Sequence, residues 1–169
     1  MGQQCANRNK PANGKRAVIL IGHGSRAAGA DEDMERIARR LRAAGNGVVE
    51  VCRMSGRGAP FAEVFEKCVG EGATMVIVIP YFLHFGVHLR QDLPAMLREA
   101  AAGRPEVRLV LGRHLGYDDA LVSLVEKRLA ESEGLCDVRE LAPAPLDRRP
   151  EENEEEGCYL FPPSGGEET

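Results

Sequence analysis

Short apolar runs of the β-strand type alternate along the chain with longer segments of helical periodicity. The apolar runs cover residues 17–21, 48–52, 75–79 and 107–111, and the first is continuously apolar, as expected of a strand buried on both faces. The helical segments begin near residues 31, 60, 92 and 117. Strands and helices that alternate at this spacing require parallel strands joined by right-handed crossovers.

In each helical segment, apolar residues recur at spacings of three and four, which indicates amphipathic helices. Asp31 is predicted to cap the first helix, and Pro94 is compatible with the first turn of the third. The predicted apolar faces consist of Met34, Ile37, Ala38 and Leu41; Phe61, Val64, Phe65 and Cys68; Leu93, Met96, Leu97 and Ala100; and Leu121, Leu124, Val125 and Leu129.

We therefore predict a three-layer α/β sandwich around a four-stranded parallel sheet, in the flavodoxin-like order 2-1-3-4. In that order the winding reverses between strands 1 and 3, so ligands are expected at their carboxyl ends. The predicted domain covers residues 16–133. It follows a flexible polar segment, 1–15, and precedes an acidic tail, 134–169, that is expected to be partly disordered.

Composition and charge exclude several classes of protein. With 169 residues, 43% hydrophobic and 28% charged, the chain can form one core and is neither fibrous nor wholly disordered. No apolar run approaches the roughly 20 residues of a membrane span, and no secretory signal is evident. The net charge of -4 is concentrated in the tail, and the nearly neutral body does not favour nucleic-acid binding.

The cysteines are scattered and lack the paired spacing of a disulfide framework or a closed zinc site. We interpret them as reduced thiols in a cytoplasmic protein. They are Cys5, Cys52, Cys68, Cys136 and Cys158.

The histidines gather after the predicted strands. His23 follows the first strand, His84 and His88 follow the third, and His114 follows the fourth. A lone loop histidine is commonly satisfied by backbone hydrogen bonds, but the topology brings the first and third loops together. Neutral imidazole binds divalent transition metals and accepts protons near neutral pH. We predict that His23 and His88 share a metal ion, with His84 as a secondary candidate because Gly86 interrupts the helical spacing.

A competing interpretation comes from the glycines beside His23. The pattern Gly22-x-Gly24-x-x-Ala27, after a strand and before a helix, matches a dinucleotide-binding fingerprint. The second strand ends in Cys52 and Arg53, without an acidic residue for a ribose. An NADP- or flavin-binding oxidoreductase in which Arg53 contacts the nucleotide therefore remains an alternative.

Three motifs together resemble the class II sirohydrochlorin chelatases of the CbiX/SirB type. They are GHGSR after the first strand, GVHLRQDLP after the third and HLGYDDAL before the last helix, within about residues 17–130. The resemblance implies a chelatase-like fold and a lyase that inserts cobalt, iron or nickel into a sirohydrochlorin-type tetrapyrrole without an organic cofactor. It implies that His23 and His88 are the functional histidines, and that this short form acts as a homodimer. Cobalt is the first choice because short-form relatives are often linked to cobalamin synthesis.

A polycarboxylate tetrapyrrole would be bound by guanidinium groups and bordered by aromatic side chains. The metal must leave the protein, which favours an open site with two or three histidine ligands over cysteine ligation. Exposed arginines, core aromatics and helix caps at Ser25 and Asp92 are the ordinary alternatives. A metal or tetrapyrrole carrier without turnover would use the same residues. The substrate-binding candidates are Ser25, Arg26, Arg53, Arg57, Tyr81, Phe82 and Arg90, with Phe85 as a further aromatic.

Overall fold

The computed structural model describes residues 14–24, 32–55, 59–84, 86–135 and 137–140. The chain divides into two compact units. The first combines Met1–Gly24 with Asp31–Gly116, and the second combines Ser25–Ala30 with Tyr117–Thr169. The predicted cap Asp31 and the predicted acidic tail beyond residue 140 lie outside the described residues.

The first unit is built on a parallel sheet of four strands in the order β2-β1-β3-β4, as predicted. The two inner strands are longer than their apolar runs, because pairing extends into flanking polar or small residues. The strands are β1 (Lys15–Gly22), β2 (Val48–Arg53), β3 (Ala73–Pro80) and β4 (Arg108–Leu111).

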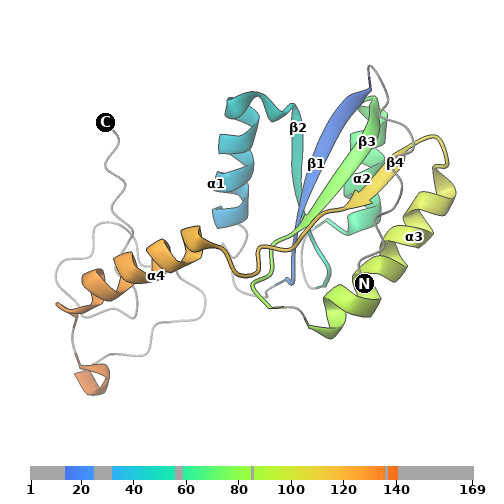
Figure 1. The fold of residues 1–169 in the computed structure, drawn as a ribbon. Coiled ribbons are helices and arrows are strands. Elements are labelled where there is room, and N and C mark those ends of the chain that lie inside the picture. The colour runs from blue at the N-terminus through green and yellow to red at the C-terminus, as the bar shows by residue number, and fades with distance from the viewer. Residues whose placement is uncertain (1–13, 25–31, 56–58, 85, 136, 141–169) are drawn as a thin grey trace. The chain divides into compact units, whose positions relative to one another are not determined.

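Helices cover both faces of this sheet, which confirms the three-layer arrangement (Figure 1). Helix α1 (Glu32–Leu41) packs through Ala38 against Leu20 and Val49. Helices α2 (Phe61–Gly70) and α3 (Leu93–Gly103) pack on the opposite face, where the larger core cluster lies. The site-bearing strand ends are thus held by a core on each side of the sheet.

The predicted helix faces in this unit are confirmed. All four apolar positions of α2 are buried. Leu93 and Leu97 are buried in α3, and Met34 and Ala38 are buried in α1. A π-helical turn, Arg42–Asn46, extends α1, and Gly45 at φ 83° and Gly47 at φ 72° end it in backbone conformations that favour glycine.

The second unit contains α4 (Asp119–Ser132) and a short 3-10 turn, Val138–Glu140. The Asp118 carboxylate caps α4 by accepting a hydrogen bond of 3.0 Å from the Ala120 backbone N–H. The predicted helix is present, but Leu124, Val125 and Leu129 are 44%, 58% and 63% exposed. In the described part of the chain, no helix has both the length and the apolarity of a membrane span.

Candidate functional site at the carboxyl edge of the sheet

The loops that leave β1, β2 and β3 are joined by backbone hydrogen bonds. The Tyr81 N–H donates to the Ile21 carbonyl at 2.8 Å, which continues the β1–β3 pairing beyond the last strand residues. On the other side of β1, the Met54 N–H donates to the Gly22 carbonyl at 2.9 Å. The residue that follows Gly22 is therefore placed between two neighbouring loops.

That residue is His23, whose side chain is exposed. Its backbone carbonyl accepts a hydrogen bond of 3.0 Å from the Ser55 hydroxyl. Its imidazole meets the Phe82 ring edge to face, with ring centroids 6.1 Å apart and an interplanar angle of 75°. The predicted meeting of the loops after β1 and β3 is confirmed by this contact.

Gly24 allows the turn to pass close to the β2 loop. Its φ is +105°, and a Cβ there would lie 1.9 Å from the Ser55 carbonyl oxygen. The second glycine of a dinucleotide fingerprint leaves room for a pyrophosphate. Here the chain's own backbone fills that space, which argues against the dinucleotide interpretation.

The segment after β3 does not form one continuous helix. His84 lies in an exposed bend, and its carbonyl accepts from the Gly86 N–H at 3.1 Å. His88 begins a separate π-helical turn, His88–Asp92, and its side chain lies outside the described part. His84 and His88 therefore do not share a helix face, so the spacing that favoured His84 is not realised. Metal binding by either residue stays a prediction.

The predicted cap at Asp92 is wrong. The π-helical turn continues directly into α3, so Asp92 has helical angles of φ -68° and ψ -49° and makes no side-chain cap hydrogen bond. A capping side chain needs a non-helical backbone at its own position. Pro94 lies in the first turn of α3, as predicted.

Arg53 and Arg90 are the described arginine candidates. Arg53 ends β2, is partly buried and pairs in register with Gly22. Arg90 is exposed on the π-helical turn, where its backbone N–H donates to the Gly86 carbonyl at 3.3 Å.

Among the aromatic candidates, Tyr81 is 36% exposed, and the partly buried Phe82 packs against the larger core cluster. Ser25, Arg26, Arg57 and Phe85 lie outside the described residues.

The loop after β4 reaches the same edge. The Gly116 N–H donates to the Phe82 carbonyl at 3.2 Å. Gly116 has φ +55°, and a Cβ there would lie 3.0 Å from His114 Nε2. The partly buried His114 thus packs beside the backbone that supports Phe82, which gives it a structural position near the site.

Metal binding at this edge stays a prediction for its histidines. No group of three or more His, Cys, Asp or Glu residues suited to a metal ion occurs among the described side chains, a set that leaves out His88. Cys68 lies on the buried face of α2, and burial raises the pKa of its thiol to about 11. Because the thiolate is the form that binds metals, Cys68 is unsuited to this role at neutral pH.

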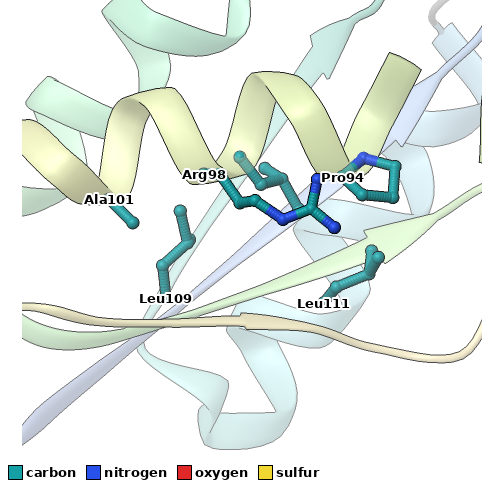
Figure 2. A pocket seen from close by; sticks show the side chains of 6 residues that line it. Pro94, Arg98, Ala101, Leu109 and Leu111 are labelled. Atoms are coloured by element: carbon teal, nitrogen blue, oxygen red, sulfur yellow. The ribbon is translucent and has the colours of Figure 1, made fainter. Parts of the chain in front are cut away.

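An apolar groove elsewhere in the unit is a poor match for a tetrapyrrole. It lies between α3 and β4, with the Arg98 side chain extended along it (Figure 2). Its volume of about 220 Å³ is below the range of roughly 300–1,000 Å³ typical of small-molecule sites. Its lining, which contains no histidine, consists of Pro94, Leu97, Arg98, Ala101, Leu109 and Leu111.

The contribution of Ser55 was not predicted from the sequence. The available signal was a hydroxyl side chain two residues beyond a strand that neighbours β1. Its contact with His23 nevertheless depends on the close approach of two loops that are 32 residues apart.

Comparison with known proteins gives a consistent result. The CbiX family model matches residues 17–132. The sirohydrochlorin ferrochelatase of Priestia megaterium is 28% identical over 117 residues, covering 69% of this chain and 44% of that protein. The sirohydrochlorin cobaltochelatase of Methanosarcina barkeri is 32% identical over 126 residues, covering 70% of this chain and 97% of that protein.

Solved structures are similar over a comparable share of the chain. The crystal structure of the sirohydrochlorin chelatase SirB from Bacillus subtilis subspecies spizizenii, in complex with cobalt, matches with a TM-score of 0.65 and 29% identity. The match covers 69% of this chain and 50% of SirB. This chain thus spans about half the length of SirB and less than half of the Priestia megaterium protein. Because the family model matches residues 17–132, which make up more than half of the chain and include the whole candidate site, the chain belongs to the CbiX family.

Proposed function

We propose that this chain is a sirohydrochlorin chelatase that inserts a divalent metal, with cobalt as first choice and iron or nickel as alternatives. The observation that carries the proposal is the contact between His23 and Phe82, which joins the two loops that bear the family's motifs. Relatives named as ferrochelatase and as cobaltochelatase both match, so the metal is left to experiment.

In the proposed mechanism, His23 and His88 bind the incoming metal through neutral imidazole nitrogens. Two protein ligands leave coordination positions open for the pyrrole nitrogens, which replace water as the metal enters the ring. The two pyrrole N–H protons are released in the same process. Each of the two imidazoles, once it has given up its bond to the metal, can accept one of these protons, because neutral imidazole is a base.

Positive side chains around this edge would hold the carboxylates of the tetrapyrrole. Arg53 lies beside the His23 turn and Arg90 lies on the His88 turn, so a macrocycle over both histidines would meet both guanidinium groups. Arg26, Arg57 and Ser25 are further candidates from the sequence. The exposed part of Tyr81 and the Phe82 ring would provide an apolar wall.

We further propose that two copies form a homodimer in the cytoplasm, so that a second half faces the first. The support is that this chain covers 44% of one relative but 97% of another, which fits a family with long and short members. Light scattering of the purified protein would measure its mass. A monomer that is fully active at the assay concentration would contradict this part of the proposal.

The central experiment follows metal insertion into sirohydrochlorin by absorbance under anaerobic conditions, with Co²⁺, Fe²⁺ and Ni²⁺ in parallel. We expect multiple turnovers by the wild-type protein. His23→Ala and His88→Ala should each lower the rate by about 100-fold or more, the size typical for removal of a positioned acid–base group. Arg39→Ala, an exposed change on α1, is the control and should keep the wild-type rate.

Other outcomes would identify the alternatives. A plateau at one equivalent of product per protein would indicate a carrier and contradict the enzymatic proposal. Retention of NADPH, or a rise in melting temperature on its addition, would support the oxidoreductase. Wild-type rates in the His88→Ala protein would remove that residue from the mechanism.

A further inference from the structure

On one side, the β2 loop holds the backbone around His23. The Ser55 hydroxyl donates to the His23 carbonyl at 3.0 Å, and the Ser55 carbonyl lies where a Cβ of Gly24 would be. The adjacent Met54 N–H donates to the Gly22 carbonyl. Three consecutive backbone positions around His23 are thus in contact with two consecutive residues of another loop.

The imidazole of His23 is held from the other side by Phe82. The aromatic contact is edge to face, and Phe82 is itself supported by the core and by the Gly116 N–H on its carbonyl. All of these residues belong to the first compact unit. The backbone of His23 is therefore restrained by the polar Ser55 side chain, and its imidazole ring is restrained by the aromatic ring of Phe82.

We propose that Ser55 and Phe82 are positioning residues for His23: Ser55 sets the backbone of the turn and Phe82 sets the orientation of the imidazole. In binding of the metal, both act through His23, and the wall proposed for the Phe82 ring concerns the macrocycle and not the metal. The inference rests on the proposed function, because its consequence for activity requires His23 to bind the metal. Partners that orient a metal-binding histidine typically change metal affinity by 10–100-fold when they are removed.

The first test uses Co²⁺ alone as the probe and two matched pairs of variants. Ser55→Ala removes the hydroxyl, whereas Ser55→Thr retains it. Phe82→Leu removes the ring, whereas Phe82→Tyr retains it. We expect Ser55→Ala and Phe82→Leu to weaken Co²⁺ binding about tenfold and to change the Co²⁺ d–d absorption spectrum, and the paired variants to restore both.

A double-mutant comparison shows whether the effect passes through His23. In a His23→Ala background, Ser55→Ala should cause no further loss of Co²⁺ affinity. An equal loss in both backgrounds would overturn the proposal, since it would show a general structural role. So would Co²⁺ affinity and spectra in Ser55→Ala and Phe82→Leu that match the wild type.

A second measurement separates this proposal from the proposed function. In the metal-free protein, the imidazole nitrogen–proton NMR signals of His23 should shift in Ser55→Ala and Phe82→Leu but not in Ser55→Thr. If the wild-type protein neither binds Co²⁺ nor inserts it, the proposed function fails, and these signals still decide the positioning roles. Unchanged His23 signals in both disruptive variants would overturn them.

Discussion

His23 and His88 both follow central strands of the sheet, but their turns are built in different ways. The His23 turn is held by direct contacts with the exposed loop after β2. These include the hydrogen bond from the Ser55 hydroxyl and the close approach of that loop at Gly24. The backbone of the His88 turn is fixed by the residues that follow it. Leu89 is 7% exposed and Leu93 is fully buried, and both belong to the larger core cluster.

This difference in how the two turns are held predicts how each histidine responds to mutation. Contacts within a polar turn contribute little to the total buried area, so their loss should move His23 while the fold persists. Buried leucines contribute to the core, so their loss should lower the free energy of unfolding before it affects the chemistry. Of the two residues proposed to share one metal, His23 is thus positioned by polar and close backbone contacts and His88 by hydrophobic burial.

Among the variants that test the contrast between the two turns, Gly24→Ala is expected to have the largest effect. The new Cβ would lie 1.9 Å from a backbone oxygen, and φ +105° is unfavourable for alanine, so the His23 turn must move. A displacement of about 1 Å at a reacting group can cost on the order of 100-fold in rate, and we expect a loss of that size in metal insertion. The rate per folded molecule is the measurement, with circular dichroism to establish the folded fraction.

Gly86→Ala is the matched control in the other turn. Among the residues that the structure describes, nothing lies within 4 Å of a Cβ at Gly86, so the rate should stay close to that of the wild type. Equal losses in both glycine variants would remove the contrast between the turns. A wild-type rate in Gly24→Ala would show that the contact with Ser55 can be relieved without moving His23.

The next effect concerns stability and the His88 turn. Leu93→Ala should lower the free energy of unfolding by about 2–5 kcal/mol, because it leaves a cavity in the core where α3 begins. Urea denaturation measures this change. Leu83→Ala, at a position that is 52% exposed, is the control and should change it by less than about 0.5 kcal/mol.

The comparison would fail if Leu93→Ala left the free energy of unfolding unchanged and reduced the insertion rate instead. That result would mean that contacts within the loop, and not the core, position the His88 turn, as they do for the His23 turn. Loss of stability with a retained rate per folded molecule is the expected pattern.

Much of this architecture follows from patterns that are local in the chain. The buried face of α2 was predicted because Phe61, Val64, Phe65 and Cys68 recur at helical spacing, and the structure buries all four. The alternation of strands and helices predicted parallel strands, and the order 2-1-3-4, the commonest for so short a unit, placed the ends of β1 and β3 side by side. The contact between His23 and Phe82 is a direct consequence of that order.

Features that depend on tertiary approach were not predictable in this way. The Ser55 hydrogen bond requires the exact path of a loop, which no periodicity encodes. The cap at Asp92 was wrong because a π-helical turn, which local propensity does not signal, precedes α3. The helical spacing correctly predicted that α4 is a helix. The spacing alone could not show that its apolar residues Val125 and Leu129 are exposed.

The smallest expected effects are those of the two arginines that flank the turns. Arg53→Ala beside His23 and Arg90→Ala beside His88 should each raise KM for sirohydrochlorin about tenfold, the cost of one charge-assisted hydrogen bond, and leave Co²⁺ affinity unchanged. The effect should weaken at high salt, because exposed charges are screened. Steady-state kinetics at two ionic strengths measure both quantities, with Arg39→Ala as control. An effect of Arg53→Ala alone would mean that the substrate contacts the His23 turn but does not reach Arg90, and would contradict the proposed contact with both arginines.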